Sequence, residues 1–134
     1  MAKTYSKMYK LRTESDEQRE VINFCRSMAD YGIEEYDLIF HIPNEGKRTE
    51  RNGARLKKEG LKKGIPDLFL PVARGKFHGL FIEMKKAGGK TSIEQKHWIA
   101  KLRKQGYLVE VCDSVKAIDL IKSYIEGGID NDIS

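Results

Sequence analysis

The apolar residues of this chain recur at two spacings, which predict an alternation of helices and strands. At the spacing of three and four residues that is typical of an amphipathic helix, Val21 and Cys25 share one face of a first helix, expected over residues 14–31. Thr13 is suited to cap the start of this helix, and Gly32 is suited to end it. The chain is therefore expected to begin its fold with a helix that buries one face.

Short apolar segments bounded by Gly, Pro, Asn or Asp predict strands, and further helical patterns lie between them. The expected strands are 38–42, 65–70, 77–85 and 107–112, and the expected further helices are a basic one over 48–59, one that starts at Ser92 and ends before Gly106, and a last one capped by Asp113 or Ser114. The resulting order, α-β-α-β-β-α-β-α, predicts an α/β layer fold with a mixed sheet that is antiparallel at the 65–85 hairpin. No repeat or linker interrupts the pattern, so one domain over 1–134 is expected, with a core at about 14–125.

The positive charge of the chain is concentrated in one segment. The 134 residues carry a formal net charge of +5, which alone is weak evidence for a polyanionic partner. The segment 47–63, called the basic segment below, holds eight basic residues against two acidic ones: Lys47, Arg48, Arg51, Arg55, Lys57, Lys58, Lys62 and Lys63. One interpretation is a solvated helix face. The other is a strip that contacts phosphates, because Lys and Arg bind nucleic acid mainly at phosphates.

The cysteines and histidines are not spaced for metal binding. Cys25 and Cys112 lie in apolar patterns without a CxxC partner, so reduced core cysteines are expected rather than a zinc site. The histidines have no second ligand at metal spacing, so surface or hydrogen-bonded core positions are expected for His41, His78 and His97.

The apolar content bears on the compartment. No apolar run is long enough to cross a bilayer. Residues 1–12 carry charge but lack the apolar segment of a secretory signal. We therefore expect a soluble, cytoplasmic protein with no membrane partner.

Three charged residues in two apolar strands carry the candidate chemistry. Asp67 lies within the strand 65–70, where an unpaired carboxylate would be costly. Glu83 and Lys85 lie in the return strand and share a face, because strand side chains alternate. If the hairpin turn centres near Gly75, the numbers of paired residues add up to 150 (twice 75), and Asp67 faces Glu83.

Two carboxylates that face each other across a hairpin should not both ionise without a cation between them. Oxygen ligands alone favour Mg²⁺, with Mn²⁺ able to substitute. Lys85 would then lie beside the metal, where it can orient or help deprotonate a bound water, or stabilise charge on a phosphate. The alternative is a structural ion pair between Lys85 and one acid. The metal site is favoured because Pro-Asp opens one strand of the hairpin and Glu-x-Lys closes the other.

Polar residues on the core-facing sides of two helices point to the same region. Glu14 and Gln18 fall near the centre of the apolar stripe of the first helix, whereas Glu17 falls toward its edge. Gln95 is expected to point inward from the next-to-last helix, although Ser92 and Gln95 also fit a capping box. Polar residues at core-facing helix ends often mark a site.

Taken in order, these segments resemble the VRR-NUC domain, a family of the PD-(D/E)xK nuclease superfamily. The resemblance runs from about Glu14 to Tyr124 and is carried by Glu14-x-x-x-Gln18, Lys63-Gly64-Ile65-Pro66-Asp67, Glu83-Met84-Lys85 and Ser92-x-x-Gln95-x-x-Trp98. It implies a restriction-endonuclease-like core. A chain this short, without accessory regions, looks like the stand-alone version found in phages and bacteria, so a phage or prophage origin in a bacterial host is expected.

The resemblance implies roles for individual residues. Asp67 and Glu83 would ligate Mg²⁺ together with the backbone carbonyl of Met84. Lys85 would be the catalytic lysine. Glu14 would complete the metal site or support it indirectly.

Further residues would support the site or hold the substrate. Gln18 and Gln95 would be supporting polar groups of the active site. The basic segment, with Lys86 and Lys90 near the Gly88-Gly89 loop, would hold the phosphates that flank the cut.

Stand-alone members of the family are similar to Holliday-junction resolvases and act as homodimers. The resemblance therefore implies a magnesium-dependent, structure-specific DNA endonuclease of DNA repair and recombination. A four-way junction needs two symmetric incisions, which a twofold dimer supplies. Cleavage of flaps, nicks or single strands by the same site remains open. So does a nucleic-acid-binding module without catalysis, which fits the basic segment but not the paired carboxylates.

Overall fold

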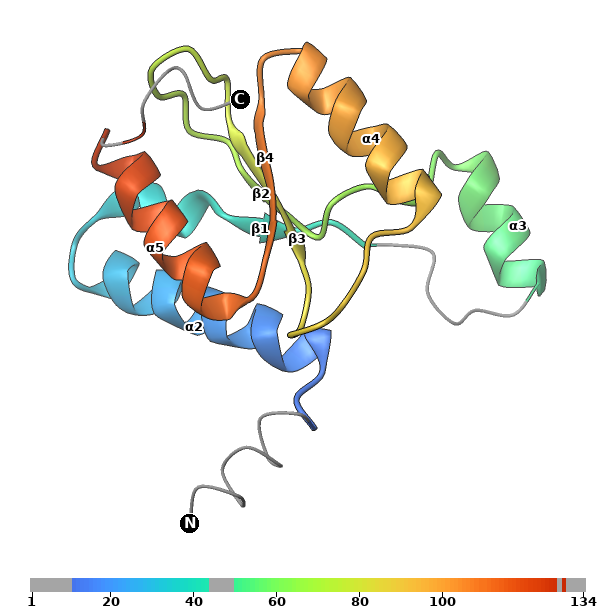
Figure 1. The fold of residues 1–134 in the computed structure, drawn as a ribbon, viewed down its shortest axis with the longest axis horizontal. Coiled ribbons are helices and arrows are strands. Elements are labelled where there is room, and N and C mark those ends of the chain that lie inside the picture. The colour runs from blue at the N-terminus through green and yellow to red at the C-terminus, as the bar shows by residue number, and fades with distance from the viewer. Residues whose placement is uncertain (1–10, 44–49, 128, 130–134) are drawn as a thin grey trace.

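The helices and strands follow one another in the order that the sequence predicts, with one short 3₁₀ helix added (Figure 1). This computed structural model describes residues 11–43, 50–127 and 129, and for residues 50 and 51 it describes only the backbone. Lys47, Arg48 and the side chain of Arg51 therefore lie outside the described part of the basic segment. The elements, labelled as in Figure 1, are α2 (Glu14–Asp30), η1 (Glu34–Leu38), β1 (Phe40–His41), α3 (Glu50–Lys58), β2 (Leu68–Leu70), β3 (Leu80–Met84), α4 (Ile93–Lys104), β4 (Leu108–Cys112) and α5 (Ser114–Ile125).

The strands form one mixed sheet in the order β1-β2-β3-β4. β2 pairs antiparallel with β1 and with β3, whereas β3 and β4 are parallel. Leu68 pairs with Ile82 and Leu70 with Leu80. The residue numbers of each pair add up to 150, so the predicted register of the hairpin is confirmed.

The two faces of the sheet carry separate apolar clusters. Leu68 and Ile82 belong to the larger one, which also includes Val21 of α2 and Ile121 of α5. The smaller cluster is made of Phe81, Val109 and Ile99 of α4. In Figure 1, α4 and α5 accordingly lie on opposite sides of β4. The sheet is thus a middle layer, with α2 and α5 against one face and α4 against the other.

Polar caps fix where the helices begin. Thr13 caps α2 in a capping box with Asp16, as predicted for Thr13. Ser92 and Gln95 form the capping box of α4. The last helix is capped by Asp113, whose side chain accepts the backbone N–H of Lys116. Of the two residues considered for this cap, Asp113 is therefore the one used.

All four strands are shorter than the sequence predicts. The return strand expected over 77–85 is limited to Leu80–Met84, and the last strand begins at Leu108 rather than Tyr107. Leu38 belongs to η1, and the strand expected over 38–42 is limited to Phe40–His41. The strand expected over 65–70 begins only at Leu68, so Asp67 precedes it. Pro66 has no N–H to donate to a ladder, which is a physical reason for this late start. The edge strand β1 is short because its partner β2 is short.

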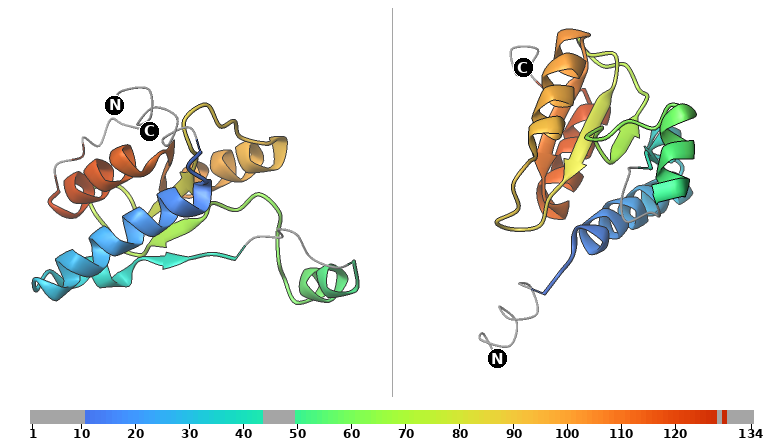
Figure 2. Two further views of the ribbon diagram at one scale, coloured as in Figure 1. Left: turned by 90° about the horizontal axis from the view of Figure 1, so that it is seen from below. Right: turned by 90° about the vertical axis from the view of Figure 1, so that its right-hand side faces the viewer.

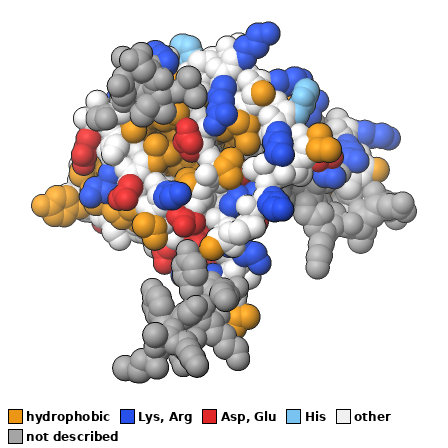
Figure 3. Space-filling model, viewed as in Figure 1, with side chains coloured by type: hydrophobic (Ala, Val, Ile, Leu, Met, Phe, Trp, Pro, Cys, Tyr) orange, Lys and Arg blue, Asp and Glu red, His pale blue; other side chains and the backbone are white. Residues whose placement is uncertain are grey.

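The basic helix α3 lies apart from the layered core, as Figure 1 and the left view of Figure 2 show. Arg55, Lys57 and Lys58 of this helix are exposed. In Figure 3, Lys and Arg side chains gather over α4 and on the side of α3. The described part of the basic segment is therefore a solvent-facing surface on one side of the molecule.

Two expectations from composition can be compared with the structure. Cys25 and Cys112 are free thiols, and burial raises the pKa of each to about 12. Cys25 lies in the core, as predicted. In the described part of the chain, no helix is both long enough and apolar enough to cross a membrane.

Candidate metal centre and active site

The acidic and basic residues predicted to carry chemistry meet at one end of the β2–β3 hairpin. Glu83 lies in β3 and is only 2% exposed, and Lys85 directly follows this strand at 8% exposed. Both alternate with Met84 and lie on the α4 side of the sheet, together with Phe81. The confirmed register, continued one residue beyond the pair of Leu68 and Ile82, places Asp67 opposite Glu83, and the two carboxyl groups interact.

Pro66 and Asp67 together change how the hairpin ends. The last ladder pair is Leu68 with Ile82, and continuing the register would place Pro66 opposite Met84, where Pro66 has no N–H for the carbonyl of Met84. The N–H of Met84 donates instead to Asp67 Oδ2, at 2.8 Å. This hydrogen bond fixes the carboxylate of Asp67 at the end of β3.

The peptide directions of β3 show where the carbonyl of Met84 points. The N–H of Lys85 donates to the carbonyl of Cys112 on β4, at 2.9 Å. The C=O and N–H of one peptide point in opposite directions, so the carbonyl of Met84 points away from β4. It therefore points to the same side as the carboxylate of Asp67, which is where the predicted backbone ligand is needed.

Glu83 is a buried carboxyl group with an unsatisfied oxygen. Gln95 Nε2 donates to Glu83 Oε1 at 2.5 Å, whereas Glu83 Oε2 is buried and has no hydrogen-bond donor among the described residues. Burial raises the pKa of Glu83 to about 9, helped by hydrogen bonding to Asp67 and by repulsion from its charge, while Lys85 acts in the opposite direction. The pair therefore holds a proton at neutral pH unless a cation takes its place.

The donor set at this point fits a small divalent cation. Asp67, Glu83 and the carbonyl of Met84 supply oxygen atoms only, which suits Mg²⁺ better than a softer metal. Among the described residues, no three His, Cys, Asp or Glu side chains form a metal-binding group. Mg²⁺ is commonly held by one or two carboxylates, with water completing its coordination, so two acids are sufficient.

Glu14 approaches the site but is not buried in it. Its Oε1 lies 3.6 Å from Nζ of Lys85, and its side chain is 47% exposed. The buried acid of this helix is Glu17, at 2% exposed, whose Oε2 accepts from Arg12 at 3.0 Å. The prediction that Glu17 lies at the edge is therefore wrong, whereas Glu14 faces Lys85 with a half-exposed side chain. The apolar pattern of the helix does not include Arg12. The ion pair with Arg12 offsets the cost of burying the carboxylate of Glu17.

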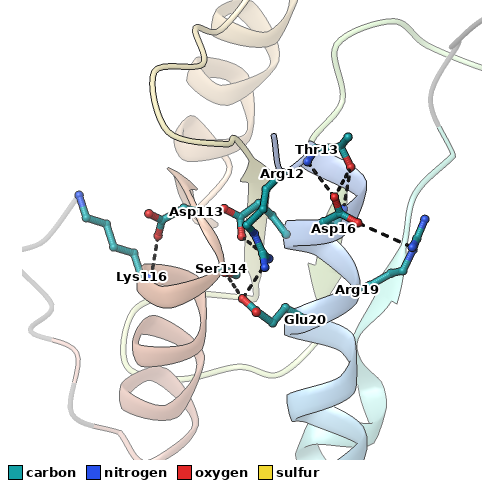
Figure 4. A network of polar contacts seen from close by, with 9 residues as sticks. Arg12, Thr13, Asp16, Arg19, Glu20, Asp113, Ser114 and Lys116 are labelled. Carbon is teal, nitrogen blue, oxygen red and sulfur yellow. Dashed lines mark hydrogen bonds and ion pairs between the residues drawn. The ribbon is translucent and has the colours of Figure 1, made fainter. Parts of the chain in front are cut away.

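A polar network holds this end of α2 against the start of α5. Arg12 contacts both Glu17 and Glu20, and Ser114 donates a hydrogen bond to Glu20 (Figure 4). Ser114 is itself buried. The network fixes the first turns of α2 and thereby the position from which Glu14 reaches Lys85.

Comparison with known proteins shows the family of this chain. The family model of the VRR-NUC domain matches residues 27–116, about two-thirds of the chain. The chain belongs to the VRR-NUC domain family. A solved structure of a VRR_NUC domain protein is 34% identical, with a TM-score of 0.73 over 87% of this chain and 91% of that one. No curated protein matches the chain.

Membership places this chain among nuclease-type domains and agrees with a restriction-endonuclease-like core. The matched range of the VRR-NUC model includes Asp67, Glu83, Lys85 and Gln95. The matched range begins after Glu14. The assignment of Glu14 to the site therefore depends on the geometry of α2 alone.

The VRR-NUC domain has a cleft of about 310 Å³ beside Asp67. It is lined by Glu14, Ser15, Gln18, His41, Asp67 and Met84. Gln18 is half-buried there, which places it at the predicted site. His41 was not predicted to belong to the site. Sequence patterns could not indicate it, because β1–β2 pairing alone brings residue 41 next to residue 67.

The predicted phosphate-binding residues that are described lie outside this cleft. Lys86 and Lys90 are exposed near the end of β3. Lys63 pairs with Glu94 in the first turn of α4 at 3.6 Å, and Arg55 pairs with Glu59 at 3.4 Å. These exposed ion pairs contribute little to stability and can exchange for phosphate contacts.

Gln95 takes part in both contacts that the sequence allowed, the capping box of α4 and a contact at the acidic site. Its Oε1 accepts the N–H of Ser92 in the capping box, and its Nε2 donates to Glu83. We expect Gln95→Ala to lower the cleavage rate about 10-fold, the value of one hydrogen bond to a charged group. Ser92→Ala is the matched control, because it weakens the cap but leaves Glu83 its donor.

Both variants should lose about 1 kcal/mol of unfolding free energy in urea titrations. Single-turnover cleavage assays should then separate them. Equal cleavage rates for Gln95→Ala and Ser92→Ala would show that Gln95 acts only as a cap.

Proposed function

We propose that this VRR-NUC domain is a magnesium-dependent, structure-specific DNA endonuclease that acts as a homodimer on four-way junctions. The observation that carries the proposal is the pairing of the buried Glu83 with the half-buried Asp67. Among the described residues, one oxygen of Glu83 has no donor, and burial and the neighbouring Asp67 raise the pKa of Glu83 to about 9. A cation shared by the two acids would satisfy both features. A carboxyl pair held only for structure would be expected to have its oxygens satisfied.

Each residue of the site would have a separate role. Asp67, Glu83 and the carbonyl of Met84 would hold the cation. When bound, a divalent cation lowers the pKa of water and neutralises charge that develops on the phosphate. Lys85 would place its ammonium beside the scissile phosphate, with Glu14 holding that ammonium in position. Gln95 would keep Glu83 oriented.

The charge distribution supports a nucleic-acid substrate. The exposed lysines and arginines of α3 and α4 lie together on one side of the molecule (Figure 3). Such residues would hold phosphates without reading bases, so sequence specificity should be low. Carboxylates repel phosphate unless a cation lies between them, and this disfavours a binding module without catalysis.

The four-way junction is proposed because it offers two symmetric cleavage positions. One active site makes one incision, and a twofold dimer presents two. A sedimentation measurement should then give the mass of two 15.4-kDa chains.

A substrate panel tests the proposal. Labelled four-way junctions, flaps, nicked duplexes and single strands would be incubated at one salt concentration, with Mg²⁺ or with a chelator. We expect Mg²⁺-dependent, paired symmetric nicks on the junction, and none from Asp67→Asn. Asp119→Asn is the matched control, because Asp119 is exposed on α5.

Each component of the proposal has its own contrary result. Unchanged cleavage by Asp67→Asn would eliminate this site. Preferred cleavage of flaps or single strands would replace the junction as the substrate. DNA binding that is indifferent to Mg²⁺, with no product under any metal, would indicate a binding module.

A further inference from the structure

His41 is a polar group of the cleft for which neither the resemblance nor the proposed metal site gives a role. It lies in β1, the edge strand of the sheet, and lines the cleft together with Glu14, Gln18 and Asp67. The ring is exposed, so no packing requirement explains a histidine at this position.

One backbone oxygen fixes the hydrogen-bonding state of the ring. His41 Nδ1 lies 3.1 Å from the carbonyl oxygen of Asp67, and the same oxygen accepts the N–H of Ile42 at 2.7 Å. A carbonyl oxygen can only accept, so Nδ1 must carry the hydrogen. In the neutral imidazole, Nε2 is then a hydrogen-bond acceptor, and it has no hydrogen-bond partner among the residues that the structure describes.

The chemistry of the substrate limits what this acceptor can bind. An internal DNA phosphodiester and its sugars offer acceptors only, and a phosphate oxygen cannot donate to Nε2. The donor that hydrolysis brings to the cleft is water. We propose that His41 positions the attacking water by accepting its hydrogen bond at Nε2, an inference that rests on the proposed function.

The proposed hydrolysis of the phosphodiester needs no reactant other than water. The water oxygen forms a bond to phosphorus, and the bond from phosphorus to the leaving sugar oxygen breaks. The water proton passes to solvent, and the leaving oxygen takes a proton from solvent. His41 changes neither charge nor proton count, so its contribution is orientation.

The competing role is structural: the ring braces the carbonyl of Asp67 and does nothing else. Two substitutions separate these roles. His41→Asn keeps an amide N–H near the place of Nδ1 but removes the acceptor at Nε2. His41→Gln can place an oxygen near Nε2 but has no donor near Nδ1. His97→Asn, on the exposed face of α4, is the matched control.

The experiment measures the single-turnover cleavage rate with Mg²⁺, junction affinity with Ca²⁺, and the melting temperature. We expect His41→Asn to lower the rate by about 100-fold, with affinity and melting temperature unchanged, and His41→Gln to recover part of the rate. His97→Asn should behave as the wild type.

Two results would assign His41 a different role. Wild-type rates for His41→Asn, together with a damaged His41→Gln, would assign the ring to bracing Asp67. A loss of affinity equal to the loss of rate would make His41 a phosphate contact. If the wild-type protein cleaves while His41→Asn is equally active, only this inference fails; if the wild type cleaves nothing, the proposed function fails as well.

Discussion

Lys85→Ala is expected to lower the rate of junction cleavage by about 100- to 1000-fold, the usual effect of removing a group that stabilises transition-state charge. The ammonium of Lys85 is nearly buried, so no other cation can replace it without rearrangement. It lies on the same face as Glu83 and within 3.6 Å of Glu14, which fixes its position. The measurement is a single-turnover assay with a labelled junction and saturating Mg²⁺.

Affinity provides the internal control for this prediction. Junction binding in Ca²⁺ should change by less than about 3-fold, because one lysine among many exposed basic residues contributes little to phosphate binding. Lys122→Ala, an exposed lysine on α5, is the matched control. Lys85→Arg should restore little activity, because the planar guanidinium does not fit a site shaped for an ammonium. A Lys85→Ala protein that cleaves at the wild-type rate would remove Lys85 from the mechanism.

The metal-free protein is expected to lose stability as the pH rises from about 6 to about 8. The pKa of Glu83 is about 9 in the folded chain, against an ordinary value of 4.5. Between these values the folded protein keeps a proton that the unfolded chain has released, so the free energy of unfolding falls with pH. One proton corresponds to about 1.4 kcal/mol per pH unit, so a loss of roughly 1–3 kcal/mol is expected in urea titrations with a chelator.

Magnesium should reverse this loss, and Glu83→Gln should abolish both effects. Mg²⁺ at about 100 times its dissociation constant adds about 2.7 kcal/mol to the wild type. Glu83→Gln resembles the neutral acid and can still accept from Gln95, so it should be more stable than the wild type at about pH 8 without metal. It should also gain nothing from Mg²⁺. Equal stabilisation of both proteins by Mg²⁺ would place the ion elsewhere.

The sequence predicted the hairpin register and the shared face of Glu83 and Lys85 correctly because that information is local. Strand alternation put Glu83 and Lys85 on one face, and the turn near Gly75 fixed the register. Both depend on residues within about 20 positions of one another, where backbone geometry dictates the outcome. The capping box of Ser92 and Gln95 was predictable for the same reason.

The predictions failed where a helix extends past the layer that it covers. Helical periodicity placed Glu14 inward, but its side chain is half-exposed and Glu17 is buried. Helical periodicity predicts which face is buried only where that face packs on a continuous apolar core. At the start of α2, the polar residues Arg12 and Ser114 take the place of such a core (Figure 4). An ion pair formed with a residue outside the helix does not appear in the apolar pattern.

By itself, the sequence determined the order of elements, the mixed sheet, the hairpin register and the acids and lysine that the hairpin brings together. Only the tertiary structure decided that Glu14 reaches Lys85, that Gln95 donates to Glu83, and that His41 belongs to the cleft. The first group follows from local backbone geometry and the periodicity of side chains. The second depends on contacts between elements distant in the chain, whose relative positions are set by how the helices and the edge strand pack on the sheet.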